Sequence, residues 1–399
     1  MKIGIIREGK IPPDSRVPLT PLQCAEVIGN GRHSLVVQAS NVRSYKDAEF
    51  QHEGVDIVDD ISDCDILLGV KEVPVNKLIE GKTYFMFSHT IKKQPYNRDL
   101  LRTILEKNIT LIDYEVLTDD SGARLIAFGK FAGMVGAHNA LWAYGQRTGT
   151  LMLPRMSECH DYAEVLEFYR NTPLPDCRIV LTGTGRVANG AAKVLFDMGY
   201  AKMDARAFLS QPARRRVFTQ LGVTDYAVHK DGKEFEETDY FNHPEEFIID
   251  FSPFYRSADI LINGIYWDPK APAFFSADEM KDDNFNICTI ADITCDIAPE
   301  SSIPSTLRAA TIAAPVFGYD PVAKKETAPY QEGFIDMMTI DNLPNELPRD
   351  ASEAFGEQFI EHILPELTNP NSMVLERGTI AANGKLGKHF QYLMDYVAL

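Results

Sequence analysis

The chain has 399 residues, a formal net charge of −17 and 45% hydrophobic residues. This length exceeds one ordinary hydrophobic core, so two domains are expected. The acidity argues against nucleic acid and anionic membranes as partners, because both bind proteins through concentrated basic surfaces.

The first 135 residues alternate strand-like and helix-like segments. Short apolar runs rich in β-branched and aromatic residues are separated by helical patterns, of which residues 97–107 are an example. This alternation predicts a parallel sheet with helices on its faces. The predicted strands are IGII, SLVVQ, VDIV, DILLGV, TYFMFS and ITLID.

A second alternating region begins near Cys177. An apolar strand leads into a helical pattern that reaches Met198, and three further strands are predicted at ARAFLS (residues 205–210), ADILING and ICTIADI. Residues 144–172 have few strand signals and are expected to link the two regions. The predicted fold class is therefore α/β, with two Rossmann-like, doubly wound parallel-sheet domains.

The ends and the cysteines of the chain indicate its compartment. No stretch approaches the roughly 18 consecutive apolar residues of a membrane-spanning helix. The start, MKIGIIREGK, lacks the apolar region and cleavage site of a secretory signal, so a cytoplasmic location is expected. The six cysteines are scattered without a CxxC pair, which favours free thiols and argues against a zinc site. No metal is expected.

The strongest local motif starts where the strand after Cys177 runs into Gly183-Thr184-Gly185 and a helix. The spacing G-x-G-x-x-A is a variant of the dinucleotide-binding fingerprint. Gly183 would permit the tight turn, Gly185 would let the backbone approach a pyrophosphate, and Ala188 would allow close helix–strand packing. The N–H groups at the helix start would bind the phosphates. A plain glycine turn is the alternative.

The choice of nucleotide depends on the next predicted strand. An acid that binds the ribose 2′-hydroxyl is expected about 20 residues after the fingerprint. Residues 205–210 end instead in Ser210, and Arg214 to Arg216 follow. A missing acid beside basic residues suits a 2′-phosphate, so NADP(H) is favoured over NAD(H). The alternative is that these arginines form a solvated helix face.

Charged and titratable residues follow several predicted strands of the first region. Because parallel strands end at the same edge of a sheet, these side chains can line one crevice. Each also has a structural alternative, such as a solvated lysine or a simple pair between Glu115 and Arg124. The residues are Arg16, Lys71, Glu72, His89, Asp113, Glu115 and Arg124.

Several stretches resemble a known superfamily. REGKIPPDSRVPLTP is similar to the N-terminal motif of the alanine dehydrogenase, transhydrogenase and saccharopine dehydrogenase superfamily. The finer resemblance is to its saccharopine-forming branch, and especially to the lysine–ketoglutarate reductase domain of animal aminoadipate-semialdehyde synthases. FMFSHTIKKQ and TIDNLPNELPRDASEAFG are the most specific stretches, and alanine dehydrogenases lack the second. The resemblance covers nearly the whole chain.

The resemblance implies two Rossmann-like domains with the active site in the cleft between them. Residues 1–135 and 340–399 would form the substrate domain, and residues 136–339 the dinucleotide-binding domain. Lys71 and His89 would be the acid–base residues. The substrate-binding residues would be Arg16, Glu72, Glu115, Arg124 and Asp341. The cofactor-binding residues would be Gly183, Thr184, Gly185, Arg186, Val187, Ser210, Arg214, Gly264 and Asp296, the last near the nicotinamide.

The implied reaction is the reversible reductive condensation of L-lysine with 2-oxoglutarate to saccharopine, with NADP(H) or NAD(H). A base must take a proton from the ε-amine of lysine, and an acid must help to expel water. Histidine side chains ordinarily titrate near neutral pH. Lys71 would do so only if burial or a neighbouring cation lowered its pKa, and the adjacent Glu72 would oppose that shift.

Other functions stay open. They are an alanine dehydrogenase-like enzyme, an opine-type enzyme that uses another amine, and a non-catalytic NADP(H)-binding regulatory protein. The presence of Lys71, His89 and both arginines argues against the last. The animal relatives also carry a glutamate-forming saccharopine dehydrogenase domain, which these 399 residues lack. A separate partner enzyme is therefore expected if the chain acts in lysine degradation.

Overall fold

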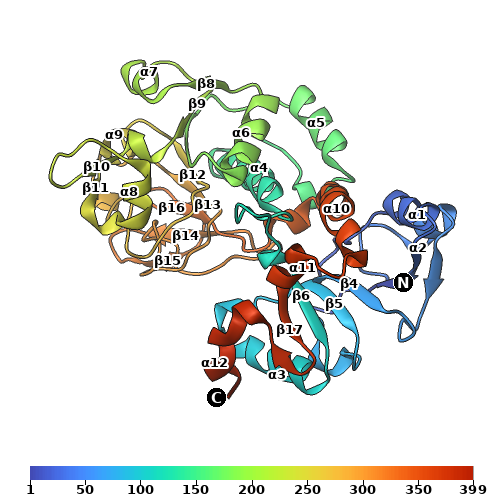
Figure 1. Cartoon of the computed structure of the whole chain (residues 1–399). Coiled ribbons are helices and arrows are strands. Elements are labelled where there is room, and N and C mark those ends of the chain that lie inside the picture. Colours follow the sequence, from blue (N-terminus) through green and yellow to red (C-terminus); the bar gives the residue numbers. More distant parts are fainter. Residues whose placement is uncertain (399) are drawn as a thin grey trace. The chain divides into compact units, whose positions relative to one another are not determined.

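The computed structural model describes residues 1–398 and divides them into two compact units (Figure 1). Unit 1 comprises residues 1–128 and the C-terminal segment from residue 348, and unit 2 comprises residues 129–347. Leu399, the last residue of the predicted segment 340–399, lies outside the described residues. The predicted boundaries at 135/136 and 339/340 lie seven residues after the first of these divisions and eight residues before the second.

Unit 1 is built on an eight-stranded sheet. Its six N-terminal strands are parallel and lie in the order β3-β2-β1-β4-β5-β6, which is the strand order of a Rossmann fold. The C-terminal segment adds β17 and β18 antiparallel beside β6. The strands are β1 (Lys2–Ile5), β2 (Ser34–Gln38), β3 (Asp56–Val58), β4 (Ile66–Lys71), β5 (Thr83–Phe87), β6 (Thr110–Asp113), β17 (Thr379–Ala382) and β18 (Lys385–Leu386).

Helices cover both faces of this sheet because successive side chains of a buried strand point to opposite sides. Leu68 of β4 belongs to the core under α1 (Pro21–Gly29), α2 (Asp47–His52) and α10 (Pro348–Gln358). Its neighbour Leu67 belongs to the core under α3 (Arg98–Glu106) and α12 (Met394–Ala398). The short helix α11 (Met373–Gly378) precedes β17. All six predicted strands of this region and the helix predicted over 97–107 are confirmed.

Unit 2 contains a second eight-stranded sheet, in the order β15-β14-β16-β13-β12-β7-β9-β8. The strands from β16 to β8 are parallel, and β14 and β15 are antiparallel additions. The strands are β7 (Arg178–Thr182), β8 (Ala201–Met203), β9 (Val217–Leu221), β12 (Ile260–Asn263), β13 (Thr289–Asp292), β14 (Val316–Asp320), β15 (Lys325–Thr327) and β16 (Ile335–Met338). A separate two-stranded sheet pairs β10 (Ala227–His229) with β11 (Phe247–Ile249).

The helices of unit 2 include one unusually close pair, α4 and α6. A Cβ atom at Gly133 would lie 1.8 Å from the carbonyl oxygen of Val187, and one at Gly190 would lie 2.0 Å from that of Lys130. Glycine is therefore required at both positions, and α6 is held firmly under the loop that precedes it. The helices are α4 (Gly129–Thr148), α5 (Tyr162–Asn171), α6 (Arg186–Asp197), α7 (Ala205–Ser210), α8 (Glu237–Asn242) and α9 (Ser252–Tyr255).

Two local predictions for this region are wrong. Residues 205–210 form helix α7, because the side chain of Asp204 caps it by accepting a hydrogen bond from the Ala207 N–H (2.8 Å). The strand beside β7 is instead β9, which was not predicted. Residues 144–172 are not a linker either, since α4 and α5 both belong to unit 2.

The prediction of two parallel-dominated α/β units is thus confirmed. Within residues 1–398, no helix combines the length and the apolar character needed to cross a membrane.

Candidate active site

The predicted acid–base residues of unit 1 lie at the point where its strand order reverses. The chain runs outward from β1 to β2 and β3, then returns to the other side of β1 as β4. The carboxyl ends of β1 and β4 therefore border the crevice in which open α/β sheets bind ligands. Lys71 is the last residue of β4, and Glu8 follows the end of β1.

Glu72 is paired with groups other than Lys71. Its Oε1 lies 2.6 Å from Lys10 Nζ, and its Oε2 lies 3.5 Å from His89 Nδ1. Burial alone would raise the pKa of Glu72, but the interactions with His89 and Lys10 outweigh it and lower the pKa to about 2. Glu72 is therefore ionised, and its two oxygens face Lys10 and His89.

Lys71 has the lowered pKa that acid–base chemistry near neutral pH requires. Burial is the main cause, followed by the nearby Arg16, and together they bring the pKa of Lys71 from 10.5 to about 8. Asp14 and Glu72 oppose the shift, whereas Lys10 assists it. Glu72 does raise the pKa of Lys71, as expected, but burial together with Arg16 and Lys10 lowers this pKa by more.

His89 is held in a strained backbone conformation at the end of β5. Its φ of 55° is left-handed, which is uncommon for a residue other than glycine. The preceding Ser88 is fixed, because its N–H donates to Asp113 Oδ2 (2.9 Å) and its hydroxyl donates to the same oxygen (2.5 Å). Asp113 is fully buried at the end of β6. The neighbouring strand thus determines where the imidazole points.

Arg16 is buried and already has a partner. Its Nε and Nη2 donate to the two carboxylate oxygens of Asp14 at 2.9 and 2.6 Å. The guanidinium also lies over the ring of Phe128, 4.3 Å from its centre. A role in binding a substrate carboxylate would therefore use the part of the guanidinium that Asp14 does not occupy.

Glu115 and Arg124 form an ion pair with each other, which the sequence left open as the alternative to a role in substrate binding. Arg124 Nη2 lies 3.4 Å from Glu115 Oε1, and Lys92 Nζ lies 3.6 Å from the same oxygen. Arg124 is well exposed, with 43% of its side chain accessible. Substrate binding by either residue stays a prediction.

Glu8 was missed by the sequence reasoning. Its Oε1 accepts a hydrogen bond from the Val70 N–H (2.6 Å) and its Oε2 accepts one from the Lys71 N–H (3.0 Å). Burial and the nearby Asp14 raise the pKa of Glu8 to about 8. The only sequence signal was an acidic residue directly after the first strand, which is common on solvated strand ends.

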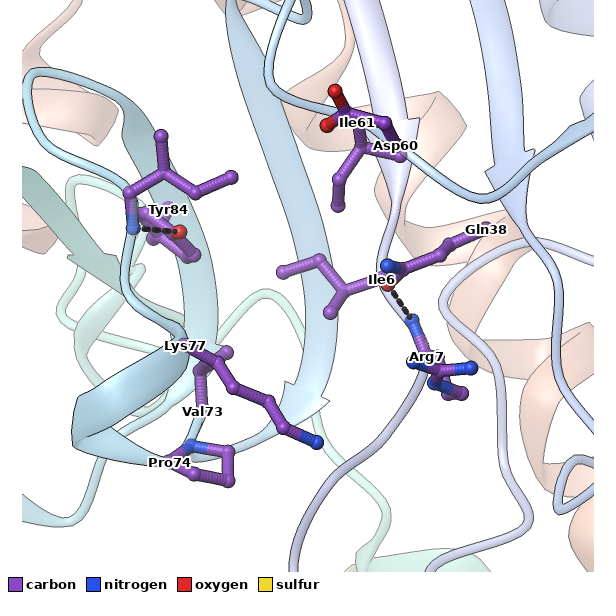
Figure 2. A pocket seen from close by; sticks show the side chains of 10 residues that line it. Ile6, Arg7, Gln38, Asp60, Ile61, Val73, Pro74, Lys77 and Tyr84 are labelled. Atoms are coloured by element: carbon purple, nitrogen blue, oxygen red, sulfur yellow. Dashed lines mark hydrogen bonds between the residues drawn. The ribbon is translucent and has the colours of Figure 1, made fainter.

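A cavity of about 330 Å³ lies beside the carboxyl ends of β1, β2 and β4 (Figure 2). Apolar and polar side chains line it in similar measure, and Figure 2 shows Lys77 and Arg7 on opposite sides of it. The Arg7 N–H donates to Gln38 Oε1 (3.1 Å). None of the predicted site residues line this cavity in the part of the chain that is described, so it is separate from the group around Lys71.

The glycine-rich loop of unit 2 has the form predicted for it. Gly183 has a φ of 100°, and a Cβ atom there would lie 2.7 Å from the carbonyl oxygen of Gly264. Glycine is required there for the turn and for the contact with the end of β12. Gly264 thus lies directly against the loop, as its predicted role requires. Thr184, Gly185 and Arg186 are exposed at the start of α6.

Gly185 indicates that the loop is shaped for a ligand. Its φ of −83° and ψ of −169° suit any residue, and a Cβ atom there would meet nothing within 4 Å. The fold itself therefore does not require glycine at this position. No side chain caps the start of α6, so its first N–H groups are available to an anion. A pyrophosphate fits this open space and these donors.

Ser210 and Arg214 do not lie at this loop, so the structure does not bring them together with the predicted phosphate-binding residues. Arg178, the first residue of β7, donates through Nη1 to the carbonyl oxygen of Arg214 (2.7 Å), and Arg215 Nη1 lies 3.1 Å from Asp259 Oδ2. This segment is therefore at the amino edge of the sheet. The glycine loop follows the carboxyl end of the five-residue β7, roughly 16 Å away.

The segment beside the glycine loop is instead the turn after β9. The Gly183 N–H donates to the Leu221 carbonyl (2.8 Å), and Gln220 Nε2 donates to the Gly183 carbonyl (3.0 Å). A Cβ atom at Gly222 would lie 3.7 Å from Thr184 Cγ2 and 3.8 Å from Asp225 Oδ2. Asp225 in this turn is an exposed carboxylate, and its Oδ2 accepts a hydrogen bond from the Gly222 N–H (2.8 Å).

Asp296 and Asp341 lie near each other in unit 2. Burial, followed by the carboxylates of Asp292, Asp341 and Asp296, raises the pKa of the Cys295 thiol to about 12. Asp341 follows β16, so it belongs to unit 2 and not to the predicted substrate segment 340–399. Both carboxylates therefore lie beyond the carboxyl ends of nucleotide-domain strands.

One group of side chains within residues 1–398 has the spacing of a metal site: the ligand atoms of His229, Asp239 and Glu246 lie within 4.8 Å of one another. His229 Nδ1, however, accepts a hydrogen bond from the Asp231 N–H (3.0 Å), so the proton of the neutral ring is on Nε2. That nitrogen faces Glu246 Oε2 at 3.3 Å. Hydrogen bonding explains the group, because a protonated ring nitrogen cannot ligate a metal.

Comparison with known families places these features in context. Residues 4–135 match the protein-family model described as "Alanine dehydrogenase/PNT, N-terminal domain". The chain is 30% identical to an alpha-aminoadipic semialdehyde synthase of Arabidopsis thaliana, over 98% of this chain and 41% of that protein. It is 29% identical to the mitochondrial protein of the same name from Bos taurus, over 95% and 46%. The chain thus spans less than half the length of these relatives.

Shorter relatives match from end to end. A saccharopine dehydrogenase [NAD(+), L-lysine-forming] of Yarrowia lipolytica is 27% identical, over 91% of this chain and 92% of that protein. Among solved structures, an L-alanine dehydrogenase superposes with a TM-score of 0.68 at 14% identity, over 100% of both chains. A transhydrogenase from Sinorhizobium meliloti gives 0.54 at 13% identity, over 97% and 98%. At such identities the structural likeness concerns the fold alone.

Proposed function

Because this chain is a homologue of L-lysine-forming saccharopine dehydrogenases and aminoadipic semialdehyde synthases, we propose that it is a saccharopine dehydrogenase of the L-lysine-forming type. The reaction is the reversible reductive condensation of L-lysine with 2-oxoglutarate to saccharopine. The observation that carries the proposal is Lys71 at the switch point of unit 1. Its pKa is lowered to about 8 by burial and neighbouring cations, and His89 follows the end of the next strand, β5.

Lys71 and His89 are the proposed acid–base pair. Above its pKa of about 8, the Lys71 amine is neutral and can accept a proton from the incoming ε-ammonium group. His89 lies on the other side of Glu72 and can donate a proton to the departing hydroxyl of the carbinolamine. The ionised Glu72 lies beside the imidazole, with its Oε2 3.5 Å from His89 Nδ1.

Arg16 and Arg124 are the proposed carboxylate-binding residues. Both carry fixed positive charges near the carboxyl edge of the sheet, and guanidinium groups bind carboxylates with two parallel hydrogen bonds. Arg124 is exposed and only loosely paired with Glu115, at 3.4 Å, so it can exchange this partner for a substrate. Arg16 donates two hydrogen bonds to Asp14, so its guanidinium would stay in place when it binds a substrate carboxylate.

The loop from Gly183 to Val187 is the proposed pyrophosphate site, and Gly264 lies against it. A nicotinamide dinucleotide bound there would supply the hydride that reduces the imine. We propose NAD(H) in place of the NADP(H) favoured by the sequence. Ser210 and Arg214 lie at the other edge of the sheet, and Asp225 lies beside the loop. A carboxylate there binds a ribose 2′-hydroxyl and repels a 2′-phosphate.

One initial-rate comparison tests substrate and cofactor together. L-lysine plus 2-oxoglutarate should be consumed with NADH, and faster than with NADPH. Pyruvate plus ammonia as the preferred pair would favour an alanine dehydrogenase instead. Turnover with another amino acid in place of lysine would favour an opine-type enzyme. Tight cofactor binding without turnover across a panel of amines and 2-oxoacids would favour a regulatory protein. A cytoplasmic location and a separate glutamate-forming partner enzyme stay predictions.

A further inference from the structure

The backbone around Lys71 is held by a side chain and not by a neighbouring strand. The parallel ladder between β1 and β4 pairs Ile5 with Leu68 and ends with the hydrogen bond from the Ile6 N–H to the Leu68 carbonyl (2.9 Å). Beyond this point β1 no longer supplies backbone acceptors. The N–H groups of Val70 and Lys71 would then lack partners on that side.

The carboxylate of Glu8 supplies the missing acceptors. Its two oxygens accept the Val70 N–H at 2.6 Å and the Lys71 N–H at 3.0 Å. Val70 is fully buried, so its N–H group would be costly to leave without an acceptor. Glu8 thus takes the place of two carbonyl groups in the sheet.

Val70 lies in a β-bulge that ends at Lys71. On the other side of β4, Leu68 is paired with Phe85 but Lys71 is paired with Phe87, so β4 has one extra residue between these pairs. A bulge re-aims the side chains that follow it and needs local support, because its ladder is interrupted. Glu8 gives that support at the point where the strand turns Lys71 toward the crevice.

We propose that Glu8 is the positioning residue of Lys71: its carboxylate fixes the bulge at Val70 and Lys71, and through it the place of the Lys71 amine. The charged groups that face Glu8 are Asp14 and Arg16 from the loop after β1, with the buried phenol of Tyr114 from the end of β6. No ion pair to Glu8 lies within 4 Å in residues 1–398, so its carboxylate is held by backbone N–H groups.

The test uses Glu8→Gln, which keeps the shape but places an NH₂ group against one of the two N–H donors. The amides of Val70 and Lys71 should exchange with deuterium about ten-fold faster than in the natural protein, as expected for the loss of one hydrogen bond. Labelling of the Lys71 amine by an amine-reactive reagent, followed by mass spectrometry, should change in rate. The matched control is Glu279→Gln, which removes a similar contact to the Ser276 N–H (2.7 Å) in unit 2.

The kinetic part of the test rests on the proposed function. Glu8→Gln should lower kcat with lysine and 2-oxoglutarate by about 10- to 100-fold, the effect of misplacing a catalytic group by about 1 Å. The Kd for the dinucleotide should be unchanged, since Glu8 is not in the nucleotide loop. Glu8→Asp keeps the carboxyl group but shortens the side chain by one methylene group, so this variant should be nearly as slow.

The two kinds of failure can be told apart. Unchanged amide exchange and unchanged Lys71 labelling in a folded Glu8→Gln protein would overturn the positioning role. Full activity of Glu8→Asp would also overturn it, because the exact position of the carboxyl group would then not matter. Altered exchange and labelling in a protein that never turns over lysine would leave the positioning role intact and refute the proposed function.

Discussion

Lys10 Nζ lies 2.6 Å from Glu72 Oε1. The carboxylate that follows Lys71 in the sequence is therefore neutralised by a different lysine, which the loop after β1 brings back to the sheet edge. Lys10 acts on Lys71 in two ways: it weakens the effect by which Glu72 raises the pKa of Lys71, and its own charge lowers that pKa. Both effects favour a neutral Lys71 amine.

Replacing Lys10 should move the pH dependence of the enzyme. In Lys10→Met, Glu72 loses its partner and the pKa of Lys71 rises from its value of about 8. The limb of the pH profile of kcat/KM that reports a neutral lysine should shift to higher pH by roughly 0.5 to 1 unit. Lys2→Met is the matched control, because it removes the pair with Asp63 (2.5 Å) at the amino end of β1. An unmoved limb in Lys10→Met would contradict this account.

Lys71→Met should separate activity from stability. The loss of an acid–base residue should lower turnover by roughly 10²- to 10⁴-fold at the optimal pH. Near-full activity in steady-state assays would refute the assignment. His89→Gln should also be slow, and its loss should not add fully to that of Lys71→Met, since both groups serve one reaction.

The same substitution should make the fold more stable at neutral pH. The folded pKa of Lys71, about 8, is below its ordinary value of 10.5, so burial of the ammonium destabilises the folded state below pH 8. This destabilisation fades as the pH rises from 8 to 10.5 and is absent above that. Lys71→Met should therefore raise the free energy of unfolding at pH 7 by roughly 1–3 kcal/mol and give a smaller gain at pH 10. Urea unfolding at both pH values measures the difference.

The fold of unit 1 could be predicted because each strand is an apolar run between clear helical patterns or turns. Lys71 and His89 could be placed at one edge, since parallel strands end together. Glu8, Lys10 and Asp113 could not be found this way. Their roles depend on side-chain contacts between strands that are distant in the sequence, and nothing in their immediate neighbours marks them.

Residues 205–210 were predicted as a strand but form helix α7, and this error also affected the predicted cofactor residues. A six-residue apolar run fits a strand or a helix, and here the capping side chain of Asp204 decides for the helix. The misassigned strand then placed Ser210 and Arg214 at the nucleotide, whereas β9 and its turn occupy that position. The glycine loop was predicted correctly because Gly183 requires its left-handed φ of 100°.

Asp225 gives a test of the cofactor. In Asp225→Ser, the loss of the carboxylate should reduce repulsion of a 2′-phosphate, so kcat/KM with NADPH relative to NADH should rise about ten-fold. Arg214→Ala should leave this ratio unchanged, because Arg214 lies at the amino edge of the sheet. A fall in NADPH use in Arg214→Ala would instead support the preference first inferred from the sequence.

Gly185 and Gly183 differ in why they are glycines, and a matched pair of alanine substitutions separates the reasons. Gly183→Ala should destabilise unit 2, because its φ is left-handed and the new Cβ would lie 2.7 Å from the Gly264 carbonyl oxygen. Gly185→Ala should leave thermal stability unchanged, since its backbone suits any residue and its Cβ would point into open space. It should nevertheless raise the Kd for the dinucleotide by about ten-fold or more, because the methyl group would stand where the pyrophosphate approaches the start of α6. Thermal unfolding and fluorescence titration with NADH measure the two effects, and unchanged binding in Gly185→Ala would show that no phosphate approaches this loop.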